Sequence, residues 1–198
     1  MIGYIKGKLL HDLGGEIILE SNGIGFSITP SSEAYKQIVA DGGGAVFTYM
    51  AVREDDISLY GFKSIEEKKM FLKLITVSGI GPKMGMTVLS NMSLTDLAVK
   101  IATSDVKGLS QIKGLGKKKA EMIIVELREK MGEELSEEKT ENASFEINLK
   151  DKDLTDAMLA LTGLGFSKEE CVAVLTKAKK ENVEGVQALI AYSLKNIR

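Results

Sequence analysis

The chain has 198 residues, of which 44% are hydrophobic and 27% charged, and its formal net charge is −2. No apolar run approaches the ~18 residues that a membrane span requires, and no secretory segment opens the chain, so we expect a cytoplasmic protein that does not contact a membrane. One cysteine, Cys171, and one histidine, His11, exclude an internal disulfide framework and argue against a zinc site or histidine-based catalysis.

The charge is unevenly distributed along the chain. Lysine and arginine number 5 against 8 acids in residues 1–63, 12 against 8 in 64–133, 2 against 5 in 134–150, and 7 against 7 in 151–198. The positive charge therefore collects in the second segment. An acidic average does not exclude a polyanionic partner when one segment is basic.

Residues 1–63 have the pattern of short strands. The candidates are rich in β-branched and aromatic residues and are separated by glycine-containing turns. They are Met1–Leu10, Glu16–Glu20, Ile24–Thr29, Ala45–Met50 and Ile57–Phe62. A short helix over Ala34–Ala40, preceded by capping serines, is expected after the third strand. Five strands with a helix in this position predict a small closed barrel of the OB type.

Residues 64–133 change to a helical period, opened by a capping box at Ser64–Glu67. Within this all-α segment, the stretch Ile75–Leu89 returns 35 residues later as Ser110–Ile124. Each copy has an apolar run, a Gly-apolar-Gly turn, a lysine and then a helical pattern. The sequence therefore predicts a duplicated helix-hairpin-helix motif.

The paired turns suggest a phosphate clamp that is present twice. Glycines at this spacing allow positive φ and let a phosphate approach the N–H groups that begin the next helix. Such contacts hold a DNA backbone without reading bases. The alternative is a helical hairpin whose glycines only close a tight connection. The candidate backbone-binding residues are Gly79, Gly81, Lys83, Gly114, Gly116, Lys117 and Lys118.

Two segments complete the chain. Residues 134–150 are acidic and lack periodicity, which predicts a flexible linker. Residues 151–198 predict three short helices, with a turn at Gly163–Phe166 and a capping box beginning at Ser167. We expect this small bundle to be tethered rather than packed on the rest, and to serve in docking.

The chain lacks the signatures of several enzyme classes. No Gly-x-x-x-x-Gly-Lys-Ser/Thr loop is present, so ATP hydrolysis is not expected, and no cofactor is implied. The acids do not form a convincing two-metal nuclease cluster. A repair nuclease or glycosylase that uses the same hairpins for grip stays an alternative. The acids of Arg53–Asp56 are either a solvated turn or a feature that repels phosphates from one place.

The whole chain resembles the RuvA family of junction-binding subunits. The resemblance rests on Val52–Asp55 with Leu59–Phe62 closing the barrel, on Gly79–Lys83, and on Gly114–Lys118. It implies a homotetramer, with two tetramers able to enclose the DNA, that binds four-way (Holliday) junctions and holds them open and planar. It also implies a RuvB-type hexameric ATPase and a RuvC-type junction resolvase as partners in recombination and repair, and no catalytic activity of the chain's own.

The resemblance also assigns roles to particular residues. Glu54 and Asp55 would form an acidic pin at the tetramer centre, where Asp56 departs from the family pattern and either joins the pin or extends the turn. Lys119 departs from it by adding a third lysine to the second clamp. The terminal bundle is similar in pattern to ubiquitin-associated (UBA) domains and would contact the motor, through exposed apolar side chains around Leu161 and Leu164.

Overall fold

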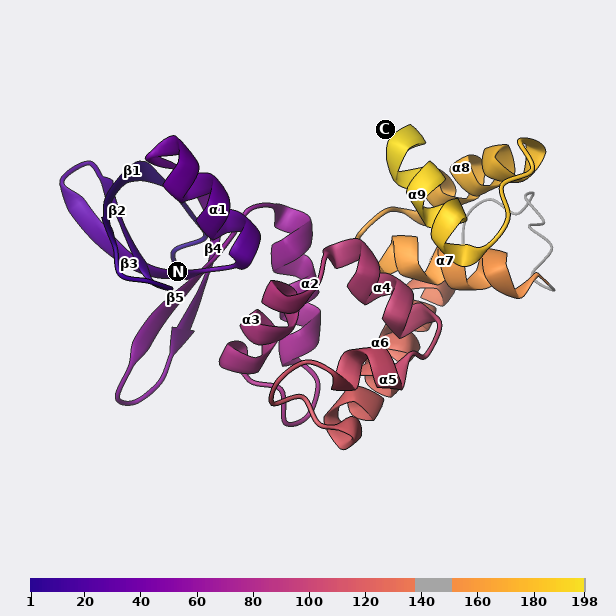
Figure 1. Cartoon of the computed structure of the whole chain (residues 1–198), viewed down its shortest axis with the longest axis horizontal. Coiled ribbons are helices and arrows are strands. Elements are labelled where there is room, and N and C mark those ends of the chain that lie inside the picture. Colours follow the sequence, from indigo (N-terminus) through magenta and orange to yellow (C-terminus); the bar gives the residue numbers. More distant parts are fainter. Residues whose placement is uncertain (138–150, 198) are drawn as a thin grey trace. The chain divides into compact units, whose positions relative to one another are not determined.

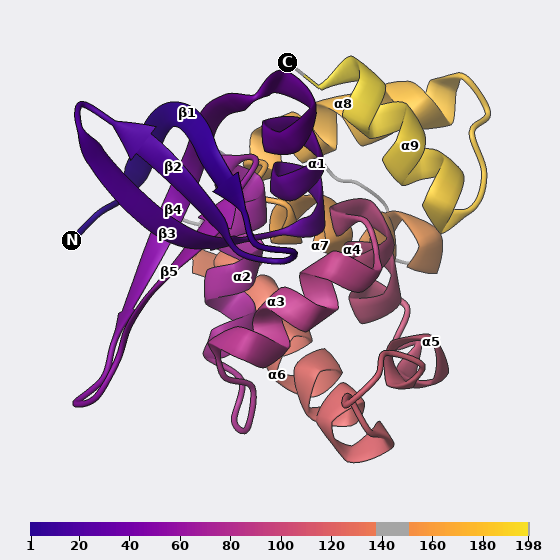
Figure 2. The same cartoon turned by 60° about the vertical axis from the view of Figure 1, so that its left-hand side comes forward.

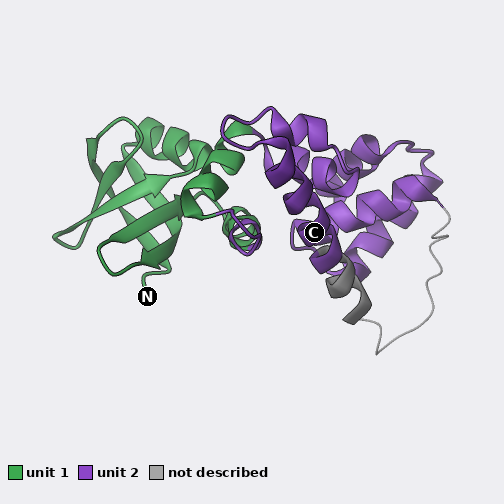
Figure 3. Ribbon diagram, turned by 90° about the horizontal axis from the view of Figure 1, so that it is seen from below, with its two compact units in different colours: residues 1–72, 81–91 green, residues 73–80, 92–198 purple. Residues whose placement is uncertain are grey.

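The computed structural model describes residues 1–137 and 151–197. They form two compact units (Figure 3). The first unit comprises residues 1–72 and 81–91, and the second comprises residues 73–80 and the described part of 92–198. Because the chain passes from the second unit back into the first at Gly81, each unit contains part of the helical segment.

The first unit contains a closed five-stranded barrel (Figures 1 and 2). Its strands are β1 (Tyr4–Asp12), β2 (Ile17–Ser21), β3 (Ile24–Pro30), β4 (Gly43–Val52) and β5 (Ile57–Phe62). Their order around the barrel is β1-β2-β3-β5-β4, with β3 and β5 parallel and the other neighbours antiparallel. Helix α1 (Ser32–Asp41) follows β3, and the Ser31 side chain caps it. The predicted OB-type barrel is confirmed.

Glycines explain where the barrel closes between β1 and β4. The sequence pattern places Gly43 and Gly44 in a turn, but the structure places them in β4, opposite Lys8 and Gly7. Gly43 has φ of 149°, and a Cβ there would lie 2.6 Å from the Gly7 carbonyl oxygen. Strand closure at this point therefore requires a backbone without side chains.

Two apolar groups stabilise the first unit. Inside the barrel, aliphatic side chains from four strands and α1 form a buried core; they are Ile5, Ile17, Leu19, Ile28, Ala34, Ile38 and Val46. Outside it, Phe71 of α2 (Ile65–Ile75) is fully buried against an aromatic group from β4 and β5. Its ring centroid lies 4.8 Å from that of Phe62, 5.3 Å from Tyr49 and 5.8 Å from Tyr60. The start of the helical segment is thereby fixed to the barrel.

The remaining helices of the duplicated segment lie where the sequence predicts a helical period. They are α3 (Pro82–Asn91), α4 (Leu94–Ala102), α5 (Val106–Ser110) and α6 (Lys117–Glu137). Ser93 caps α4 by accepting from the Asp96 N–H, and Asp105 caps α5 by accepting from the Gly108 N–H. Lys100 donates to the Asp105 carboxylate over 2.8 Å, and this bond, with the one from Gly108, lowers the Asp105 pKa.

The terminal helices are α7 (Lys152–Gly163), α8 (Lys168–Lys180) and α9 (Val186–Asn196). Ser167 and Glu170 form the predicted capping box of α8. The prediction that the bundle is not packed is wrong, because α7 lies against α4 and α6 within the second unit. The carboxylate of Asp156, buried in this packing, lies 3.6 Å from Arg128 of α6. The run Ala157–Leu161 of α7 is apolar without interruption and buried throughout, so it is covered on several sides at once, whereas pattern alone indicates one buried face.

The predicted linker is described only at its start. Helix α6 continues to Glu137 and so extends past the expected boundary at residue 133. The rest of the predicted linker, residues 138–150, lies outside the described residues. Within the described ranges, no helix combines the length and the apolar character needed to cross a membrane.

Candidate nucleic-acid interface

The two copies of the repeat have the same backbone hydrogen bonds. Three backbone N–H to carbonyl hydrogen bonds define the first copy: Val77 to Leu74, Ile80 to Val77, and Gly85 to Gly81. The second copy has the same three bonds 35 residues later: Ile112 to Leu109, Leu115 to Ile112, and Ala120 to Gly116. The six N···O distances lie between 2.9 and 3.1 Å. The sequence repeat is therefore also a repeat of local conformation.

The first glycine of each turn is required by the backbone. Gly79 has φ of 76° and Gly114 has φ of 84°, a region that favours glycine. The apolar residue after each of these glycines turns inward, and Ile80 is 3% exposed while Leu115 is fully buried. That buried side chain fixes the turn, which leaves the following glycine at the start of a helix.

The second glycine of each turn has a different explanation. Gly81 and Gly116 lie outside the left-handed region, and a Cβ at either would meet nothing within 4 Å. Their carbonyls accept the first hydrogen bonds of α3 and α6, so each occupies the N-cap position without a capping side chain. At the start of α3, Pro82 has no N–H, so the donors before the first helical bond are the N–H groups of Lys83 and Met84, and at the start of α6 they are those of the three lysines. These N–H groups have no partner within their own helix and can meet another acceptor. No part of the chain that the structure describes excludes a side chain at these two glycines, whereas a closely approaching ligand would.

The charges at these helix starts favour an anion. Acids lie in the first turns of α1, α2, α4, α7 and α8, as the helix dipole favours. In contrast, α3 carries Lys83 there, and α6 begins with three lysines and no acid. Lys117 and Lys118 are exposed. The Lys117 Nζ lies 3.8 Å from the Glu121 Oε1, and such a surface ion pair contributes little to the free energy of folding. Cations at the positive end of a helix destabilise it, and a bound phosphate would offset that cost.

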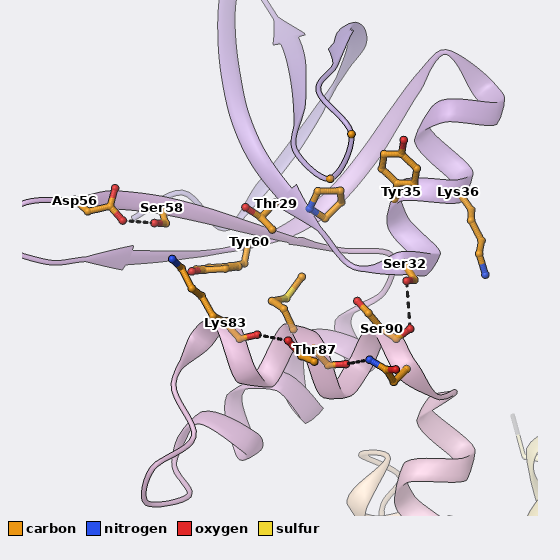
Figure 4. Close-up of a pocket in the computed structure, with 15 residues that line it drawn as sticks. Thr29, Ser32, Tyr35, Lys36, Asp56, Ser58, Tyr60, Lys83, Thr87 and Ser90 are labelled. Carbon is orange, nitrogen blue, oxygen red and sulfur yellow. Dashed lines mark hydrogen bonds between the residues drawn. The ribbon is translucent and has the colours of Figure 1, made fainter. Parts of the chain in front are cut away.

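Lys83 also lines a groove of about 980 Å³ in the first unit. Its side chain points toward β5, beside Tyr60 (Figure 4). Lys36 of α1 lies in the same lining, as do Asp56 and Ser58 near the start of β5. Lys36 was not predicted, because α1 gives no sequence signal that it shares a surface with α3. The groove therefore places Lys83, a predicted phosphate-binding lysine, on the same surface as Asp56, the last residue of the acidic turn.

The acidic turn lies at the tip of the β4–β5 hairpin, which extends beyond the rest of the barrel (Figures 1 and 2). Its backbone is closed by the Arg53 N–H, which donates to the Asp56 carbonyl over 2.8 Å. The side chains of Glu54, Asp55 and Asp56 are exposed. Asp56 accepts a 2.5 Å hydrogen bond from Ser58, which holds its carboxylate at the root of the turn. Glu54 and Asp55 therefore form the outermost acids of this hairpin.

The two apolar residues predicted to be exposed are buried. Leu161 is fully buried at the end of α7, and Leu164 is 5% exposed. The prediction of exposure is wrong because α7 contacts α4, α6, α8 and α9. Cys171 is buried. Among the residues that the structure describes, no group of three or more histidine, cysteine or acidic side chains is placed to hold a metal ion.

The chain belongs to the class of proteins in which an OB-type barrel is followed by tandem helix-hairpin-helix motifs. Family models match all three parts: "RuvA N terminal domain" over residues 1–61, "SAM-like Helix-hairpin-helix tandem" over 71–129, and "RuvA, C-terminal domain" over 152–198. The chain belongs to the RuvA family.

Relatives match the chain over nearly its full length. A protein of Alkaliphilus oremlandii is 39% identical over 198 residues, covering 98% of both chains. One of Chromobacterium violaceum is 36% identical over 98% of this chain and 100% of its own. One of Acetivibrio thermocellus is 36% identical over 100% of this chain and 98% of its own. Each is named "Holliday junction branch migration complex subunit RuvA".

Proposed function

We propose that this chain binds four-way DNA junctions through its two helix-hairpin-helix turns and couples them to a motor for branch migration. The observation that carries the proposal is the pair of equivalent turns, each with an uncapped glycine and a lysine at a helix start, on a chain of this family. Two such turns can hold successive phosphates of one strand without reading bases. The residues of the two clamps are Gly79, Gly81, Lys83, Gly114, Gly116, Lys117 and Lys118.

Selectivity for a junction requires several copies of the chain. The two phosphate-binding turns of one chain would bind any duplex. A fourfold homotetramer instead presents four equivalent pairs of these turns to the four equivalent arms of a junction. In this arrangement the acidic turns meet at the centre. Repulsion between phosphates and the carboxylates of Glu54 and Asp55 keeps the strands apart there and holds the junction open and planar.

The remaining parts of the proposal concern partners and organisation. Residues 1–63 and the helical segment from 64 to the end of α6 at Glu137 serve as the DNA-binding platform. Residues 138–150 serve as a linker, and 151–198 as the module that contacts a RuvB-type hexameric ATPase. A second tetramer and a RuvC-type resolvase would bind the same junction. The chain itself acts in the cytoplasm as a non-catalytic subunit, in recombination and repair.

A gel shift with a four-way junction and a linear duplex of equal length tests the proposal. The junction should bind more tightly than the duplex, and both DNAs should stay intact in the presence of Mg²⁺. Equal affinities would contradict junction selectivity. Metal-dependent cleavage would instead favour a repair nuclease.

Replacing Lys117 and Lys118 by glutamine should make junction binding less sensitive to salt. The plot of log K against the logarithm of salt concentration has a negative slope, and each phosphate contact that is lost makes this slope less negative by about 0.9. Binding measured between low and moderate salt gives this slope directly. Lys152→Gln with Lys180→Gln, two exposed lysines of the terminal bundle, provides the matched control. An unchanged slope in the first variant would show that the second clamp does not contact phosphates.

Replacing Glu54 by glutamine and Asp55 by asparagine should tighten junction binding, because it removes repulsion from phosphates at close range. The amides keep the size of the side chains, so the hairpin should fold unchanged. Binding to junction and linear duplex should be measured side by side. The variant should gain affinity for the junction and change little toward the duplex. If neither junction affinity nor branch-migration rate changes, the acids form only a solvated turn.

A further inference from the structure

The outer part of the β4–β5 hairpin is a two-stranded ribbon with two different faces. β1 pairs with β4 from Gly43 to Phe47, and β3 pairs with β5 at Tyr60 and Gly61. From Met50 to Leu59 the two strands pair with each other, and the structure shows no further strand partner for this part of the described chain. Such a ribbon exposes both faces as it leaves the barrel.

One face of the ribbon is apolar up to the acidic turn. Val52 pairs with Ile57 and Met50 with Leu59, and alternation along each strand places all four side chains on the same face. Leu59 packs against the barrel core. Val52 and Ile57, farther out, are 63% and 68% exposed. The apolar face of the ribbon therefore extends from the barrel core to Val52 and Ile57, an exposed aliphatic pair that flanks the turn carrying Glu54 and Asp55.

The other face is polar and belongs to the groove that Lys83 lines. Asp56 and Ser58 are joined by a hydrogen bond, and both line that groove. Ile57 precedes Ser58 in β5, so its side chain points to the face opposite that of Ser58. A phosphate can thus meet cations in the groove, but it meets two carboxylates at the tip and only aliphatic groups on the apolar face.

The chemistry of the apolar face selects one part of a DNA molecule. Phosphates are repelled by the acids above the pair and gain nothing from aliphatic side chains. The flat faces of nucleobases are the neutral, weakly hydrated surface of DNA, and apolar side chains elsewhere wedge against them where stacking is interrupted. In a continuous duplex these faces are covered by neighbouring base pairs. They become accessible where strands exchange between arms.

We propose that Val52 and Ile57 contact the faces of unstacked nucleobases at the crossover of a bound junction. This inference rests on the proposed junction binding and assigns to the ribbon an attractive contact beside the repulsive one. The acids keep the phosphates away, and the aliphatic pair stabilises the bases that are left without a stacking neighbour. The hairpin would then favour an open crossover through both terms.

The test is the full-length double variant Val52→Thr with Ile57→Thr on a junction that carries 2-aminopurine at the crossover. Threonine keeps the β-branched shape and the strand preference, so the ribbon should be retained. Fluorescence of 2-aminopurine rises when the base unstacks. We expect the rise on binding to fall by about half or more in the variant, since the apolar contact to the base is lost. The gel-shift affinity should stay within about threefold of the wild type, because the phosphate clamps are intact.

Ile24→Thr provides the matched control. Ile24 begins β3 and is 59% exposed, so it is an aliphatic strand residue of similar exposure away from the ribbon. Its replacement should leave both fluorescence and affinity unchanged. Thermal unfolding of each variant shows that the barrel is retained.

The outcomes separate this inference from the function on which it rests. A wild-type chain that binds junction and duplex equally would overturn the proposed function. If the wild type prefers the junction but the double variant gives the full fluorescence rise, the base contact is overturned and junction binding stands. A double variant that changes the mass of the free assembly would show that the pair contacts another copy of the chain, which also overturns the base contact.

Discussion

Replacing Gly81 and Gly116 by serine should weaken junction binding by at least about 100-fold while leaving the fold as stable as before or more stable. Serine at an N-cap accepts hydrogen bonds from the first N–H groups of its helix, the groups that a phosphate would use. A hydrogen bond to a charged group is worth about 1.5 kcal/mol, so losing two gives about 100-fold for a single protomer, which is the least that a tetramer should lose. Gel-shift affinity and the midpoint of thermal unfolding measure the two effects.

The opposite directions of these effects make the prediction specific. Capping should hold or raise the unfolding midpoint, because a Cβ at either glycine meets nothing within 4 Å. Gly3→Ser is the matched control, since Gly3 also has open space and lies outside the left-handed region. A serine variant that binds as tightly as the wild type would show that DNA does not approach these glycines. One that unfolds early would show a structural role instead.

Deleting residues 138–198 should abolish stimulation of a RuvB-type ATPase and spare junction binding. The described part of α6 ends at Glu137, so this cut keeps all of that helix that the structure describes. The clamps and the acidic turn are retained, and the proposed motor contact is removed. Junction affinity by gel shift and DNA-stimulated ATP hydrolysis by the motor measure the two outcomes separately.

The structure requires one control for this deletion. Because α7 lies against α4 and α6, the cut exposes apolar surface on the second unit, and thermal unfolding must show that the remainder stays folded. The variant Asp156→Asn, in the full chain, removes the charge that lies beside Arg128 without removing the bundle. It should keep motor stimulation. A deletion that still stimulates the motor would place the motor contact elsewhere.

The sequence predicts most of the architecture because its signals are local. Two Gly-apolar-Gly turns at a fixed spacing and a helical period predict the duplicated hairpins, and both copies adopt the same hydrogen bonds. Capping residues predict helix starts for the same reason. Ser167 caps α8 as expected, since a cap depends on residues within one turn.

The predictions that failed depend on partners distant in the sequence. Gly43 and Gly44 have the composition of a turn, yet closure against β1 makes them part of a strand. Leu161 and Leu164 have the composition of an exposed docking surface, yet the packing around α7 buries them. A one-dimensional pattern records that a residue is apolar or flexible. It does not record which segment will cover it.

The sequence by itself therefore determined the barrel, the two hairpin turns, the uneven charge and the acidic turn, because each is encoded within a short stretch. Only the tertiary structure showed that Gly79 and Gly114 serve the backbone while Gly81 and Gly116 leave helix N–H groups open. It also placed Lys36 and Lys83 on one groove and gave the β4–β5 ribbon a polar and an apolar face. These features depend on strand pairing and helix packing, which bring together residues that no local pattern relates.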